Sequence, residues 1–140
     1  MFPSSFSLLI LLLSGKEYAK SDSRYLTHDS FVVPMETFTA FVEGPLALVT
    51  AYGILYDRPY RWVLQILVSF GELYGDILYY ASAWWHDFPH SRPEPLYFWF
   101  YFFFMNFLWI VLPFILIVQA VWHVTHIHSE YQRLVAQKKK

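Results

Sequence analysis

Residues 95–122 read PLYFWFYFFFMNFLWIVLPFILIVQAVW, and this stretch decides the fold. It contains no charged residue, and about 20 apolar residues in a helix are enough to cross about 30 Å of hydrocarbon. We therefore predict a transmembrane helix over about residues 96–122.

Asn106 is the polar exception within this helix. In an α-helix, Trp109 follows it by one turn, and Phe102 and Trp99 precede it at i−4 and i−7, so all four share one side. An amide group in hydrocarbon must find a partner or face a cavity, because an unpaired one costs several kcal/mol. We expect this side to face a protected interior.

The composition indicates a membrane protein. Of 140 residues, 56% are hydrophobic and 22% are aromatic, and the mean hydropathy is +0.33. The net charge of −1 gives no overall field that would favour nucleic acid as a partner. The absence of cysteine excludes disulfides, thiolate metal sites and cysteine nucleophiles.

Two more helices are predicted before the aromatic one, over about residues 34–56 and 60–82, with a tight turn between them. Gly44–Pro45 is expected to bend the first of them, because proline removes a backbone hydrogen bond. Residues 83–95, rich in tryptophan and proline, are predicted to form a loop at the membrane interface.

The two ends of the chain differ from this helical part. Residues 1–15 form a short apolar segment that is too short to span a bilayer, and a signal peptide is the alternative. Residues 16–30 are charged and are predicted to form a connecting loop with residues able to cap the next helix. Residues 127–140 are expected to form a polar basic tail, cytosolic by a small excess of positive residues, which leaves 16–126 as the membrane domain.

Carboxyl groups follow one face of each of the first two predicted helices. Glu36, Thr39 and Glu43 lie at i, i+3 and i+7 of the first helix. On the second helix the spacings are four, three and four, for Gln65, Ser69, Glu72 and Asp76. Ionisable groups inside a membrane are costly and usually have a function or a strong partner. Two helices thus bring carboxyl groups to one interior.

Three interpretations of these residues stay open. Carboxyl groups beside tryptophan faces in an apolar cavity suit proton transfer through a carbocation on a lipid-soluble substrate, with no metal or redox cofactor. A ligand pocket without chemistry explains the same residues, and so do polar contacts that only hold helices together. A metal site at His123, His126 and His128 is not favoured, since juxtamembrane histidines are common. The terminal lysines suit anionic headgroups better than nucleic acid.

Four blocks of this sequence carry a resemblance: KEYAKSDSRY at 16–25, METFTAFVEGPLAL at 35–48, LQILVSFGELYGDILYY at 64–80 and LYFWFYFFFMNFLWIVLP at 96–113. Together they closely resemble the emopamil-binding protein family, the sterol 8,7-isomerases of the EXPERA superfamily. The resemblance implies a multi-pass enzyme of the endoplasmic reticulum membrane. It would move a sterol double bond from the 8(9) to the 7(8) position by protonation and loss of a different proton. It also implies binding of cationic amphiphilic drugs.

The resemblance also implies roles for particular residues. Glu36 matches the family's proton-transfer carboxyl group, and Asn106 and Trp109 match the pair that contacts the sterol and its cationic intermediate. These three are the predicted catalytic residues. The residues predicted to bind substrate are Arg24, Tyr25, Thr39, Glu43 and Glu72, of which Arg24 and Tyr25 match the loop at the pocket mouth.

The family has five crossings, and its second helix supplies a histidine and a glutamate to the active site. The first 15 residues here offer neither, so the resemblance implies that this chain corresponds to the C-terminal part of the family fold. A homodimer, in which a partner fills the missing walls, stays open.

The sequence therefore predicts an all-α membrane bundle of three helices from the sterol isomerase family. The alternatives are a non-catalytic membrane protein that binds sterols or cationic amphiphiles, and a structural subunit. Because two catalytic side chains are missing by this comparison, we expect the 140-residue chain to have little or no isomerase activity. Restored sterol synthesis in isomerase-deficient cells would contradict this expectation.

Overall fold

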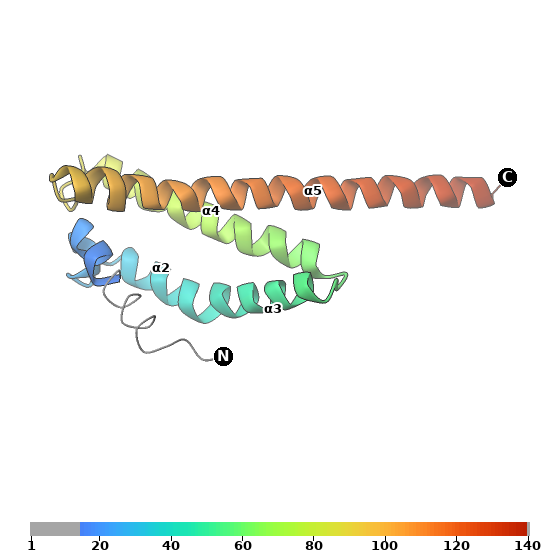
Figure 1. Ribbon diagram of the computed structural model, residues 1–140, viewed down its shortest axis with the longest axis horizontal. Helices are drawn as coiled ribbons and strands as arrows, with labels where there is room; N and C mark the ends of the chain where they lie inside the picture. The colour runs from blue at the N-terminus through green and yellow to red at the C-terminus, as the bar shows by residue number, and fades with distance from the viewer. Residues whose placement is uncertain (1–14, 140) are drawn as a thin grey trace.

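The computed structural model describes residues 15–139, and in that range it is helical without strands. Residues 15–21 are helical, followed by η1 (Ser23–Tyr25). Three long helical stretches follow (Figure 1). They are built from α2 (Val32–Phe38), η2 (Thr39–Glu43) and α3 (Gly44–Leu55), then α4 (Arg61–Trp85), then η3 (Leu96–Phe104) and α5 (Met105–Lys138). The all-α prediction is confirmed.

The first stretch begins where Asp29 caps it. The backbone N–H groups of Phe31 and Val32 each donate to Oδ1 of Asp29 at 2.9 Å. These bonds hold the pKa of the Asp29 carboxyl group below its usual value, and the bond from Val32 has the larger effect. This capping residue was among those that the sequence suggested.

The predicted bend at Gly44–Pro45 takes the form of a π-helical segment. The N–H of Gly44 donates to the carbonyl of Thr39, five residues earlier, and Pro45, which has no N–H, follows in the first turn of α3. The helix axis changes direction at this point without a break (Figure 1).

Helix α4 packs mainly against α5. Nε2 of Gln65 donates to the carbonyl of Leu116 at 2.9 Å and to Oε1 of Gln119 at 3.1 Å. Gln65 is buried, so part of the predicted polar face of α4 serves to hold the two helices together.

The last stretch is longer than predicted. Leu96–Lys138 is one helix of 43 residues, about 65 Å long, and it continues through the residues expected to form a polar tail. After Pro113 the sequence has no proline or glycine to end the helix, and the Arg133–Glu130 ion pair at 2.6 Å supports its last turns. Figure 1 shows this part projecting past α3 and α4.

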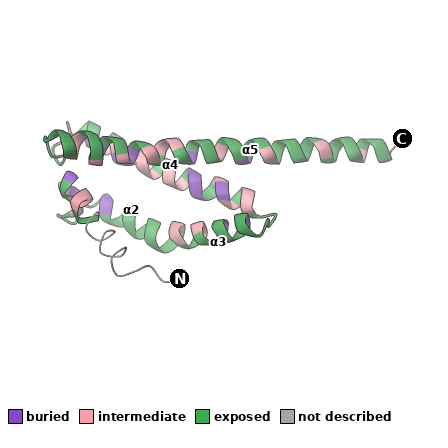
Figure 2. Cartoon of the chain, in the orientation of Figure 1, coloured by how far each residue is buried: buried purple, intermediate pink, exposed green. Residues whose placement is uncertain are grey.

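Two of the helical stretches, Val32–Leu55 and Leu96–Lys138, are long and apolar enough to cross a membrane. Their apolar side chains are mostly exposed, as expected of helices that face lipid (Figure 2). Helix α4 carries Glu72 and Asp76 and is not in this class.

The connecting segments are partly as predicted. The loop prediction for residues 16–30 is wrong for residues 16–21, which are helical, whereas the segment after Trp85 forms the expected loop. The interpretations of residues 1–13 lie outside the described residues.

A buried polar network joins these two segments to α4. Asp22 and Arg24 are 1% and 4% exposed, and Nη2 of Arg24 lies 2.6 Å from Oδ2 of Asp22. Nη1 of Arg24 donates to Ser82 at 2.8 Å, and the hydroxyl of Tyr79 donates to Asp22 at 2.6 Å. The loop after α4 is tied in as well, since Asp22 pairs with Ser91 in an antiparallel bridge.

Removing Arg24 should therefore destabilise the protein strongly. Arg24→Ala leaves the Asp22 carboxylate buried without its cation, and we expect a loss of about 3–5 kcal/mol in the free energy of unfolding. Tyr79→Phe removes one donor and should cost about 1–3 kcal/mol. The measurement is reversible unfolding in detergent, followed by far-UV circular dichroism.

The matched control is Arg133→Ala, which removes an exposed arginine from an i, i+3 pair on α5. Its cost should stay below about 1 kcal/mol. Equal losses for the two arginine variants would contradict the structural role of the buried network.

Candidate functional site

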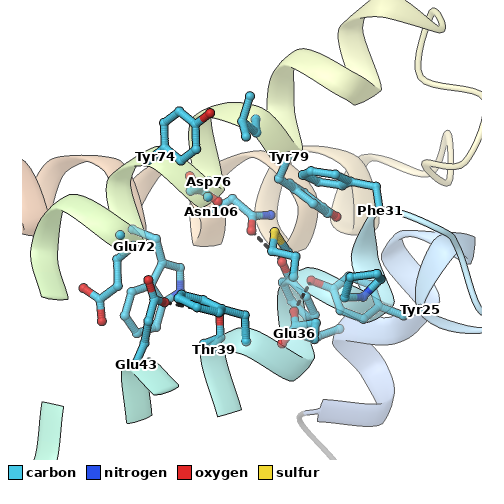
Figure 3. Close-up of a pocket in the computed structure, with 18 of the residues that line it drawn as sticks. Tyr25, Phe31, Glu36, Thr39, Glu43, Glu72, Tyr74, Asp76, Tyr79 and Asn106 are labelled. Atoms are coloured by element: carbon cyan, nitrogen blue, oxygen red, sulfur yellow. Dashed lines mark hydrogen bonds between the residues drawn. The ribbon is translucent and has the colours of Figure 1, made fainter. Parts of the chain in front are cut away.

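A cavity of about 830 Å³ lies between the α2–η2 stretch, α4 and the start of α5 (Figure 3). Tyr18 and Tyr25, from the segment before α2, also line it. Its wall is mostly apolar and aromatic, with a few polar groups. This size and lining are typical of sites for drug-sized apolar ligands.

Glu36 stands on this wall and is held by a loop residue. The hydroxyl of Tyr25 donates to Oε1 of Glu36 at 2.9 Å. Burial raises the pKa of the Tyr25 hydroxyl above its ordinary value, so Tyr25 stays protonated and remains a donor at physiological pH. The Tyr25 ring packs edge-on against Tyr18 at 5.5 Å between centroids. The carboxyl group of Glu36 is therefore oriented before any ligand binds.

Asn106 is fixed in a similar way on the facing helix. It is 5% exposed, its Oδ1 accepts from the hydroxyl of Tyr18 at 2.5 Å, and its Nδ2 donates to the carbonyl of Phe102 at 2.5 Å. Trp109 lies one turn further and lines the same cavity. The sequence predicted that the amide group of Asn106 has either a partner or a cavity beside it, and it has both.

A second polar group lies further along the first helical stretch. Oγ1 of Thr39 donates to Oε2 of Glu43 at 3.3 Å, and the other oxygen of Glu43 sits where a Cβ atom on Gly71 would be. Glu72 follows Gly71 on α4, and Figure 3 shows the carboxyl groups of Glu43 and Glu72 on the same side of the cavity. Glycine at position 71 makes this close approach possible.

The structure brings all but one of the predicted site residues to this cavity. Those on its wall are Tyr25, Glu36, Thr39, Glu43, Glu72, Asn106 and Trp109. The exception is Arg24, whose guanidinium lies in the buried network, 4.3 Å from the centroid of the Tyr79 ring.

The predicted side shared by Trp99, Phe102, Asn106 and Trp109 is not observed. Trp99 is 61% exposed, and Phe102 belongs to the core with Val32, Tyr79 and Ala83. Leu96–Phe104 is π-helical, with more residues per turn than an α-helix, so the spacings of four and seven no longer mark one side.

Sequence reasoning missed several cavity residues, among them Tyr18, Met35, Asp76 and Tyr79. Asp76 was recognised as part of a polar face but was not assigned to the site. Tyr18 lies in a segment predicted as a loop, so no helical pattern pointed to its contact with Asn106.

Comparison with known proteins shows the family to which this chain is similar. A model of the EXPERA (EXPanded EBP) superfamily matches residues 11–120. The chain is 48% identical over 115 residues to 3-beta-hydroxysteroid-Delta(8),Delta(7)-isomerase of Mus musculus. These aligned residues make up 81% of this chain and 50% of the mouse protein.

Two other relatives align with similar shares of this chain and of their own length. The isomerase of the same name from Cavia porcellus is 47% identical over 76% of this chain and 47% of its own length. Isomeliandiol synthase of Melia azedarach is 34% identical over 75% of this chain and 49% of its own length. The chain thus spans about half the length of the curated relatives it matches.

The two glycines of α4 offer a matched test of the Glu43 position. Replacing either by alanine favours the helix by up to about 1 kcal/mol. At Gly75 the new Cβ would meet only Sδ of Met35 at 3.9 Å, an ordinary contact, whereas at Gly71 it would displace the carboxyl group of Glu43. We expect Gly75→Ala to stabilise the protein more than Gly71→Ala in detergent unfolding.

The difference should disappear when Glu43 is also replaced by alanine, because the displaced group is then gone. Equal effects of the two glycine variants in the presence of Glu43 would contradict the observed close approach.

Proposed function

The chain belongs to the EXPERA superfamily, and from this premise we propose that it acts on a sterol and shifts a double bond from the 8(9) to the 7(8) position. The arrangement that carries this proposal is the carboxyl group of Glu36, held by Tyr25, across an apolar cavity from Asn106 and Trp109. The names of the mammalian relatives support the choice of substrate.

The reaction needs one proton delivered and one removed. Protonation of C9 leaves a cation at C8, and loss of a proton from C7 forms the new double bond, with no net oxidation or reduction. We assign the proton transfer to Glu36, because a carboxyl group in an apolar cavity can act as acid and then as base. The hydrogen bond from Tyr25 sets its direction.

Asn106 and Trp109 would act on the cationic intermediate. The indole face of Trp109 attracts positive charge, and the fixed amide of Asn106 keeps the adjacent wall polar where charge develops. Arg24 would contribute indirectly, since it holds Tyr79 and the loop that carries Tyr25.

The remaining predicted residues would contact the ligand further along the cavity. We assign this role to Thr39, Glu43 and Glu72. The carboxyl groups of Glu43 and Glu72 would also attract the ammonium group of a cationic amphiphile. We further propose three crossings of the endoplasmic reticulum membrane within residues 16–126, in which α4 crosses in addition to the two apolar stretches.

A second candidate is a protein that binds sterols or cationic amphiphiles without converting them. The observation that favours it is the pair Glu43 and Glu72, which lies apart from Glu36 and suits a cation rather than proton transfer to a carbon (Figure 3).

Conversion of sterol in deuterated water tests the first candidate. We express the chain in isomerase-deficient cells and supply an 8(9)-sterol to their membranes in D₂O. The expected product is a 7(8)-sterol that carries one deuterium at C9. We expect it to form slowly, below the level that restores sterol synthesis, because the sequence predicts little activity for these 140 residues, and Glu36→Gln should lower this rate by at least about 100-fold. The measurement is mass spectrometry of the extracted sterols.

Thr37→Ala is the matched control, because Thr37 is exposed next to Glu36 and bonds only to the backbone carbonyl of Val33. Its rate should equal that of the unaltered chain. Saturable sterol binding without any conversion would overturn the isomerase and support the second candidate.

A further inference from the structure

Within residues 15–139, one buried side-chain oxygen has no hydrogen-bond partner, and it is Oδ2 of Asp76. Asp76 lies on α4 and lines the cavity, beside Asn106 in Figure 3. Buried polar groups without a partner are rare in native proteins, and each needs an explanation.

The hydroxyl groups that could have satisfied Asp76 are bound elsewhere. Tyr79 and Tyr80 lie three and four residues after it on the same side of α4. Tyr79 donates to Asp22, and Tyr80 donates to the carbonyl of Phe103. Tyr18, from the other side, donates to Asn106. The wall around Asp76 therefore supplies hydroxyl groups but directs each of them away from it.

We propose that the carboxyl group of Asp76, which lines the cavity, turns to bind the hydroxyl group of the sterol ligand and so gives its unpaired oxygen a partner. This inference rests on the proposed function, which makes a 3-hydroxysteroid the ligand of this cavity. A sterol has a single polar group on a large apolar skeleton, and a buried, unpaired carboxyl oxygen beside a mostly apolar cavity wall is a complement to that group.

A hydroxyl group suits this position whatever the protonation state of Asp76. It donates to an ionised carboxylate, and it accepts from a protonated carboxyl group. No other single group of a sterol can do either.

The placement also leaves the reacting carbons free to approach Glu36. Asp76 and Glu36 come from α4 and α2, on different walls of the cavity (Figure 3). In a sterol the 3-hydroxyl group is on the first ring and the 8(9) double bond is between the second and third. A hydroxyl group at Asp76 therefore lets the ring system extend across the cavity, away from α4.

The test compares a radiolabelled 8(9)-unsaturated 3β-hydroxysterol with its 3-deoxy analogue, on the full chain in detergent. We expect the unaltered chain to prefer the hydroxysterol by at least about tenfold in Kd, the cost of leaving a buried polar atom unpaired. Asp76→Leu, which keeps the branched shape but removes the polar atoms, should reduce this preference to less than about twofold.

Two further variants make the result specific. Asp76→Asn should keep most of the preference, because an amide both donates and accepts. Tyr74→Phe removes a cavity hydroxyl from the same helix and should keep it as well. Circular dichroism checks that each variant is folded, and Asp76→Ala replaces Asp76→Leu if the leucine is not accommodated.

The outcomes separate this inference from the proposed function. A preference that persists in Asp76→Leu, or that is absent in the unaltered chain, overturns the role of Asp76 while sterol binding stands. A chain that binds neither sterol overturns the proposed sterol function together with this inference.

Discussion

The rest of the structure depends on the hydrogen bonds and the ion pair that the buried carboxylate of Asp22 accepts. It accepts hydrogen bonds from Arg24 and from Tyr79, and its backbone pairs with Ser91. The site is 1% exposed, so the segment that carries Asp22 and Arg24 cannot leave α4 without losing hydrogen bonds of this buried pair to Tyr79 and Ser82, which would be costly. The arrangement ties the segment before α2 and the loop after α4 to one end of the bundle.

That anchored end places the side chains of the proposed site. Tyr25 follows Arg24 by one residue, and its hydroxyl reaches Glu36 only because the segment is fixed against Tyr79. Tyr18, a few residues earlier, reaches Asn106 across the cavity. Part of the cavity wall is therefore supplied by tyrosines that lie outside the two apolar stretches that could span a membrane.

The helical stretches and the shared interior of the carboxyl groups could be predicted from the sequence, for physical reasons. Length and hydropathy predict the helical stretches well, because the cost of exposing backbone groups to hydrocarbon leaves few alternatives. The carboxyl groups at helical spacing correctly indicated a shared interior, since Glu36, Glu43 and Glu72 all line one cavity.

What could not be predicted depends on contacts between distant residues. Trp99 was misplaced because π-helical turns between Leu96 and Phe104 change the side on which it points. Arg24 was expected at the ligand because its motif does not reveal that Asp22, two residues earlier, takes the charge. Asp76 was passed over because only the structure shows that its neighbouring hydroxyl groups are engaged elsewhere.

The two ends of the cavity differ in packing, and this difference fits the proposed division of roles. At one end, Tyr25, the donor to Glu36, packs against the buried cluster of Val32, Tyr79, Ala83 and Phe102. Proton transfer to a carbon demands a fixed geometry, which a donor held against a buried cluster supplies. At the other end, the carboxyl group of Glu43 lies beside Gly71 and accepts a hydrogen bond from the hydroxyl group of Thr39. This end lies outside the buried cluster, which suits the proposed contact with a cationic ligand better than proton transfer to a carbon.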